Sequence, residues 1–170
     1  MTTTPTNTKQ RSLVRNAVLD TVLIALACLI PSVSHLLGLP LRNLNPMLML
    51  VVAGVLLSDN KWNTYLLALA LPFVTSLISG MPSPLGALCM VLEYATVVTM
   101  LTLLLYTGRQ TTKTFAVALA AMLTGKAVYY LAKWLIIRPD QLITTAVGWQ
   151  VASLLVIALL FAIVWPKTNH

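Results

Sequence analysis

The chain has 170 residues, of which 58% are hydrophobic and only 9% are charged. Soluble domains usually carry about 25% charged residues, so this composition excludes an ordinary soluble protein and indicates an integral membrane protein. The formal net charge of +7 would suggest nucleic-acid binding in a soluble protein. In a membrane protein it reflects basic loops that face the cytoplasm, so we expect no nucleic-acid partner.

The first residues are polar and rich in threonine, so Met1–Gln10 does not form a signal peptide. We expect residues 1–16 to be a disordered cytoplasmic tail. Residues 17–166 are then a single membrane domain, and residues 167–170 are a cytoplasmic C-terminus.

Six apolar segments follow one another along the membrane domain, and each predicts a helix. The six expected helices cover residues 17–37, 47–57, 64–79, 85–106, 114–137 and 148–165. At about 1.5 Å per residue against a hydrocarbon core of about 30 Å, the second helix is short for a span. It crosses only if the bilayer thins or if Leu44 to Ser58 are included.

Residues that start and stop helices mark two of the turns. Asn45 is expected to cap the second helix, with Pro46 in its first turn. Gly80 is expected to end the third helix with a positive φ. Ser83 and Pro84 then begin the fourth helix in the same way as Asn45 and Pro46 begin the second.

The distribution of basic residues orients the six spans. The side that holds both termini carries seven Lys and Arg residues, whereas the opposite loops carry only two, Arg42 and Arg138. The seven are Lys9, Arg11, Arg15, Lys61, Arg109, Lys113 and Lys167. By the positive-inside rule, we expect an all-α protein of the inner (cytoplasmic) membrane with both termini in the cytoplasm.

The sequence contains none of the motifs HExxH, GxSxG, Walker A or a Gly-rich dinucleotide loop. His35 and His170 lie far apart in the predicted topology, and Glu93 is the only acid expected deep in the membrane. Cys28 and Cys89 lie in apolar runs without the spacing of a metal or redox site. We therefore expect no enzymatic activity, no metal and no cofactor bound by this chain.

One face of the expected fifth helix collects five basic and aromatic residues. They recur at steps of three and four, and they are Lys126, Tyr129, Tyr130, Lys133 and Trp134. Glu93, in the fourth helix, lies about 12 Å from the outer end and Lys126 about 18 Å. Because neither charge is tolerated facing lipid, we expect both to face a common cavity in the outer half of the bundle.

Two interpretations of these charges remain open. Glu93 and Lys126 form a structural ion pair between helices, or they belong to a pocket for a small solute. Two lysines against one acid leave a surplus positive charge, which favours an anionic or carboxylate-bearing ligand. The aromatic faces suit a planar ring. The expected substrate-binding residues are Glu93, Lys126, Tyr130, Lys133, Trp134, Trp149, Arg42 and Asn43, with Gln150 as a further candidate for the same cavity.

Small residues on the first helix predict a contact with a partner. Ala17, Thr21 and Ala25 recur at four-residue spacing, which lets a second helix approach closely.

With its short length, six spans and basic cytoplasmic side, the chain resembles the substrate-binding S-components of energy-coupling factor (ECF) vitamin transporters. The resemblance is carried by His35–Pro40, by Pro46–Gly54, and by the Gly80-Met81-Pro82 turn that leads to Glu93. The series Ala17, Thr21, Ala25 approximates the Ala-xxx-Ala docking motif of that family.

This resemblance implies a high-affinity binder that takes up a vitamin or vitamin precursor from the outside. It also implies a transmembrane coupling subunit and two ATPase subunits, which would use the ATP. One alternative is a non-transporting membrane scaffold similar to the rod-shape protein MreD, which binds partners and needs no polar pocket. A further alternative is an intramembrane enzyme, which would need a second catalytic group near Glu93.

Overall fold

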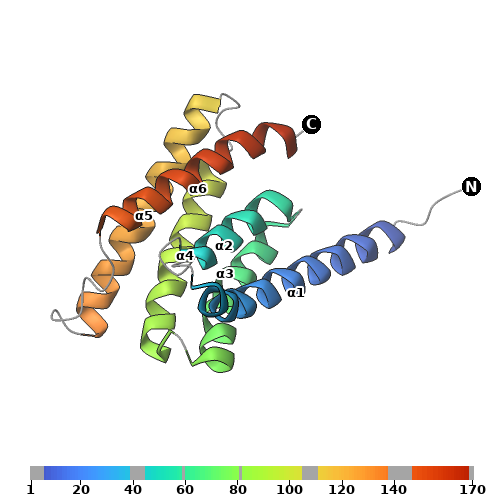
Figure 1. Cartoon of the computed structure of the whole chain (residues 1–170). Coiled ribbons are helices and arrows are strands. Elements are labelled where there is room, and N and C mark those ends of the chain that lie inside the picture. The colour runs from blue at the N-terminus through green and yellow to red at the C-terminus, as the bar shows by residue number, and fades with distance from the viewer. Residues whose placement is uncertain are drawn as a thin grey trace, which may run out of the picture.

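The computed structural model describes residues 6–38, 45–58, 60–80, 82–104, 111–137 and 147–168. Six helices cover nearly all of these residues, as expected of an all-helical protein. They are α1 (Thr6–Leu37), α2 (Pro46–Leu57), α3 (Lys61–Ser79), α4 (Pro84–Leu104), α5 (Thr111–Ile136) and α6 (Val147–Thr168). Figure 1 shows them as one bundle, with α5 and α6 along one side and α1 on the other.

Five of these helices, all except α2, are long and apolar enough to cross a membrane. The chain therefore has the helices of a multi-pass membrane protein. The exception, α2, has 12 residues, which corresponds to a length of about 18 Å at 1.5 Å per residue.

The short helix α2 lies in the middle of the bundle, where it contacts α1, α3, α4 and α6 (Figure 1). Its side chains Leu48, Val51 and Val52 are buried and belong to the hydrophobic core. The other helices contribute apolar side chains around it. Those that are almost completely buried include Leu67 and Leu71 of α3, Val97, Val98 and Leu101 of α4, and Phe161 of α6.

The turn between α3 and α4 has the predicted geometry. Gly80 adopts φ 69°, and its N–H donates to the carbonyl oxygen of Ser76 at 3.0 Å. The hydroxyl oxygen of Ser83 accepts from the N–H of Gly86 at 3.3 Å, and Pro84 is the first residue of α4. The prediction of a C-cap followed by an N-cap is confirmed here.

The start of α2 differs from the prediction at one residue. Pro46 lies in the first turn as expected, but Asn45 adopts φ 48° and its side chain makes no capping hydrogen bond. The Asn45 Oδ1 atom instead accepts from the hydroxyl of Tyr94 at 3.5 Å. The prediction of a side-chain cap is therefore wrong, because the side chain is used to join α2 to α4.

The first helix begins earlier than the sequence predicts. We expected a disordered tail up to residue 16, but α1 starts at Thr6 and continues without interruption to Leu37. Residues 6–16 contain no Pro or Gly that would stop a helix, so α1 extends back to Thr6, directly after Pro5. At the other end of the chain, α6 continues to Thr168, into the segment expected to follow the membrane domain.

Polar contacts join the first part of α1 to the bundle. The guanidinium of Arg15 donates to the carbonyl oxygen of Leu57 at 3.3 Å, and the side-chain amide of Asn63 donates to Asp20 at 2.9 Å. Apolar contacts add to these, since Leu23 and Ala27 of α1 are buried in the core and Leu19 and Ile24 pack against it. The end of α2 and the start of α3 thus lie level with the early turns of α1.

Candidate ligand-binding site

An ion pair between α4 and α5 forms the base of the candidate site. The Nζ atom of Lys126 lies 2.8 Å from Oε1 of Glu93. The two partners differ in exposure, since the Glu93 side chain is 1% exposed and the Lys126 side chain is 17% exposed. The pair therefore reaches from the core, at the carboxylate, to a surface that a ligand can touch, at the ammonium.

The close approach of α4 and α5 depends on Gly125, the residue before Lys126. A Cβ atom at this position would lie 2.5 Å from Cγ2 of Val97 and 3.1 Å from the backbone oxygen of Glu93. Only the absence of a side chain lets the two helices pack this closely, as is common in membrane bundles. The glycine thereby brings Lys126 within reach of the carboxylate.

Tyr129 lies between the two lysines of α5. The Lys126 ammonium lies 4.8 Å from the centre of the Tyr129 ring, and the Lys133 ammonium lies 6.0 Å from it. Both distances are in the range of cation–π contacts, so the ring contributes to holding each ammonium. Tyr129 in turn packs edge-on against Tyr130, with ring centres 5.4 Å apart.

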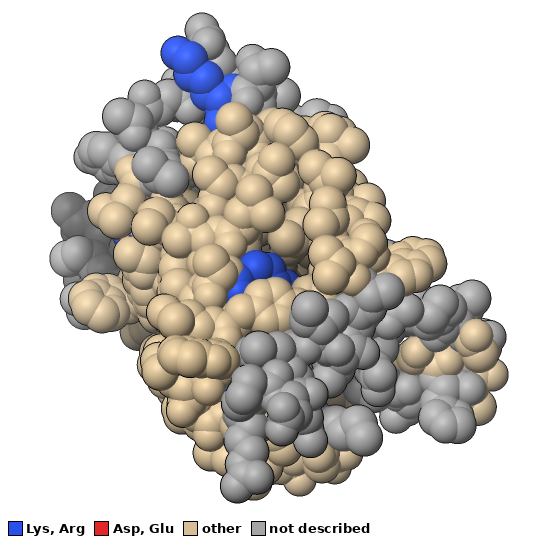
Figure 2. All heavy atoms as spheres, turned by 90° about the vertical axis from the view of Figure 1, so that its left-hand side faces the viewer, with Lys and Arg blue, Asp and Glu red and all other residues tan. Residues whose placement is uncertain are grey.

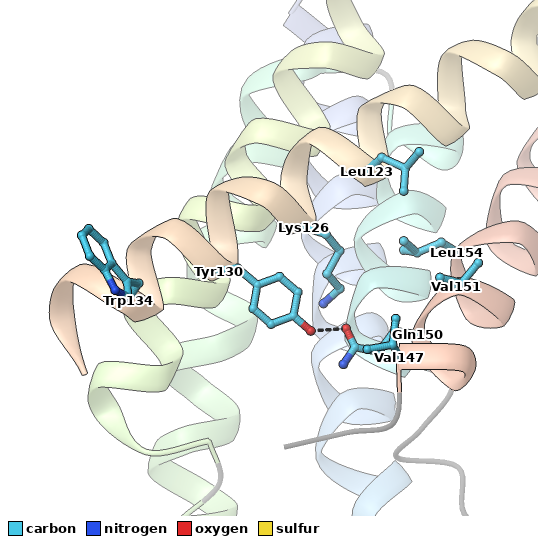
Figure 3. Close-up of a pocket in the computed structure, with 8 residues that line it drawn as sticks. All are labelled: Leu123, Lys126, Tyr130, Trp134, Val147, Gln150, Val151 and Leu154. Atoms are coloured by element: carbon cyan, nitrogen blue, oxygen red, sulfur yellow. Dashed lines mark hydrogen bonds between the residues drawn. The ribbon is translucent and has the colours of Figure 1, made fainter. Parts of the chain in front are cut away.

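A pocket of about 420 Å³ lies between α5 and α6, directly beside Lys126. Its volume is within the range of about 300–1,000 Å³ that is usual for ligand sites. The lining residues are Leu123, Lys126, Tyr130 and Trp134 of α5 and Val147, Gln150, Val151 and Leu154 of α6. Figure 3 shows Lys126 and Tyr130 pointing from α5 toward the first turns of α6.

A hydrogen bond joins the two walls of the pocket. The hydroxyl of Tyr130 donates to Oε1 of Gln150, which fixes the start of α6 against α5 (Figure 3). The remaining wall is almost entirely apolar. In the space-filling view of this side of the molecule, a basic side chain is visible at the bottom of a hollow among uncharged atoms (Figure 2).

The structure brings together some of the predicted substrate-binding residues. Lys126, Tyr130 and Trp134 line the pocket, and Glu93 lies behind it as the partner of Lys126. Gln150, the further candidate, also lines it. Whether any of these side chains contacts a ligand stays a prediction.

Other predicted residues lie elsewhere. Lys133 is 6% exposed, its ammonium lies 6.0 Å from the centre of the Tyr129 ring, and it is not among the lining residues. Trp149 is 50% exposed and is not among the lining residues. Arg42 and Asn43 lie outside the described residues. Neither Lys133 nor Trp149 lines this pocket, and their place beside a bound ligand stays a prediction.

The apolar residues that form the pocket walls were not predicted from the sequence. On α6, the residues that line it are Val147, Gln150, Val151 and Leu154, which follow the three- and four-residue steps of one helical face. This pattern was available from the sequence, but apolar residues on a membrane helix are common to lipid-facing and pocket-facing positions. Only the placement of α6 beside α5 separates the two cases.

No group of three or more His, Cys, Asp or Glu side chains that could hold a metal ion occurs in the part of the chain that the structure describes. Both cysteines are free, with Cys89 buried and Cys28 partly buried. The polar chemistry of the site is thus that of a lysine ammonium, a tyrosine hydroxyl and a glutamine amide.

Comparison with known proteins gives no relative, since no family model, curated protein or solved structure matches this chain significantly.

Proposed function

We propose that this chain is the membrane-embedded binding subunit of an ATP-driven importer, of the kind represented by the S-components of ECF transporters. Its ligand would be a small, anionic or ring-containing micronutrient, such as a vitamin or vitamin precursor. One observation carries the proposal. A pocket of about 420 Å³ lies over the ammonium of Lys126, which is itself held by the buried carboxylate of Glu93.

The proposed topology has six spans in the inner (cytoplasmic) membrane, with both termini in the cytoplasm. Two contacts support it. The bonds from Arg15 to Leu57 and from Asn63 to Asp20 join the early part of α1 to the α2–α3 connection. These contacts favour a return of the chain to the side of its N-terminus after α2, although α2 alone is shorter than the hydrocarbon core.

The energy for uptake would come from other subunits. The sequence has no nucleotide-binding motif, so transport would require a transmembrane coupling subunit and two ATPase subunits. The exposed residues Ala17, Thr21 and Ala25 of α1 are available for such a contact, since they are not buried against the rest of this chain.

Native mass spectrometry of the gently solubilised full chain tests the proposal. We expect the wild-type protein to retain a small molecule, and the double variant Glu93→Gln/Lys126→Gln to lose it. The matched control is Asp20→Asn, which changes a carboxylate on α1 and should leave the bound molecule in place. A wild-type protein that carries no small molecule at any detergent concentration would contradict the proposal.

A second candidate function is that of a membrane scaffold similar to MreD. The observation that favours it is the burial of Glu93, which is 1% exposed and lies against the backbone of α5 at Gly125. A carboxylate in this position can serve the fold alone. The same mass-spectrometry experiment separates the two functions, because a scaffold would release protein partners and no small molecule.

A further inference from the structure

The mouth of the pocket between α5 and α6 is built from apolar side chains on the outward faces of both helices. Leu123, Trp134, Val147 and Val151 are each between 45% and 55% exposed. Deeper in, Leu154 is 2% exposed and the Lys126 side chain is 17% exposed. The pocket therefore passes from an apolar rim to a single ammonium.

This rim lies within helices that are long and apolar enough to span a membrane, Lys113–Ile136 and Val147–Trp165. In such a segment, exposed apolar side chains are suited to contact with lipid acyl chains. An opening toward water would instead be lined by polar groups. The rim is thus suited to the bilayer and not to an aqueous vestibule, and Figure 2 shows uncharged atoms on all described sides of the hollow.

The interior also restricts the ligand. The polar lining residues are Lys126, Tyr130 and Gln150, and the last two already bond to each other. A ligand with many polar groups would leave most of them without partners, which disfavours its binding. Lys126 carries three donors, and its charge contact with Glu93 leaves the ammonium able to donate toward the pocket.

From these observations we infer that the pocket binds an amphiphile, which enters sideways from the bilayer through the opening between α5 and α6. Its single acidic head meets Lys126, and its apolar body lies along Leu123, Val151 and Leu154. This inference rests on the proposed binding function and narrows its ligand class. It also changes the route, because the ligand reaches the site after dissolving in the membrane.

The test is equilibrium binding of radiolabelled laurate to the full chain in nanodiscs, corrected with empty nanodiscs. Butyrate, which has the same head without the long apolar body, is the comparison ligand. We expect saturable binding of laurate and at least tenfold weaker binding of butyrate. Dodecanol, which lacks the acidic head, should also bind at least tenfold more weakly than laurate.

Two substitutions on α6 locate the binding. Val151→Phe places a ring in the pocket, whereas Leu155→Phe adds the same ring to an exposed position one turn away that does not line it. We expect Val151→Phe to reduce laurate binding at least tenfold and Leu155→Phe to leave it unchanged. Leu123→Phe, on the opposite wall, serves as a second blocking variant if Val151→Phe does not fold.

The outcomes separate this inference from the proposed function. Laurate binding that is insensitive to both blocking variants would overturn the inference, since the site would lie elsewhere. Absence of laurate binding would overturn it as well. If native mass spectrometry nevertheless finds a polar solute that the blocking variants remove, the pocket is a binding site with a different ligand, and the proposed function stands without the lateral route.

Discussion

Lys126 and Glu93 are joined at 2.8 Å across the α4–α5 contact, and only the lysine end of the pair is open to a ligand. Charge in a membrane interior is tolerated when it is paired. The carboxylate therefore allows an ammonium to be kept beside an apolar pocket.

The variant Glu93→Gln should destabilise the fold, because it leaves the Lys126 ammonium without its opposite charge. Breaking a fully buried pair costs about 3–5 kcal/mol. We expect about 1–3 kcal/mol here, since Lys126 is 17% exposed and can turn toward the pocket. Unfolding in mixed micelles measures the change. The control Glu93→Gln/Lys126→Gln removes both charges and should recover most of the lost stability; a single variant as stable as wild type would show that the pair does not hold the fold.

The variant Gly125→Ala should also destabilise the bundle, by about 1–3 kcal/mol, because overpacking forces side chains or backbone to shift. The added methyl would meet Val97 at 2.5 Å and the Glu93 backbone at 3.1 Å. Gly148→Ala is the matched control, since nothing lies within 4 Å of the position of its Cβ atom. Melting temperatures should fall for the first variant and not for the second. Equal effects would contradict the close packing of α4 on α5.

Single-cysteine labelling tests the topology in a background where Cys28 and Cys89 are replaced. Lys61→Cys lies at the α2–α3 connection and Ser83→Cys at the α3–α4 turn, so they should face opposite sides of the membrane. We expect an impermeant maleimide to label Ser83→Cys in intact cells. Lys61→Cys should react only after permeabilisation. Labelling of Lys61→Cys from outside would mean that α2 does not cross.

The exposed face of α1 should bind the coupling partner. Ala25→Trp adds bulk to this face without entering the core, so the melting temperature should stay unchanged. ATPase activity that co-purifies with the chain from native membranes should fall at least fivefold. Leu159→Trp, on the exposed side of α6, is the control and should not alter it. Equal co-purification of wild type and Ala25→Trp would place the docking surface elsewhere.

The helices themselves were largely predictable, because apolar runs and the turn at Gly80 and Ser83 are local signals. The start of α1 was not, since nothing in the first residues separates a polar helix from a disordered tail. Asn45 was misjudged for a different reason. Its contact with Tyr94 joins residues that are far apart in sequence, and local capping preferences contain no information about such contacts.

The candidate site was predictable only in part. The depths of Glu93 and Lys126 were sufficient to bring these two residues together. The shared helical face of α5 was too coarse, because only part of it lines the pocket. Lys126, Tyr130 and Trp134 line the pocket beside α6, whereas Tyr129 and Lys133, which contact each other, are not among the lining residues. A helical repeat alone does not show which neighbouring helix each residue of a face meets.

The central position of α2 has a thermodynamic consequence. This helix contacts both α1, which carries the proposed docking face, and α6, which forms one wall of the pocket. If α2 transmits no change between these two helices, the free-energy effects of substitutions at Ala25 and Val151 should be additive. Gly54, whose Cβ would lie 2.5 Å from Leu67 and 3.9 Å from Leu23, is a position at which such transmission can be altered. A double-mutant cycle between Ala25 and Val151, repeated in a Gly54→Ala background, would measure the coupling free energy between ligand and partner.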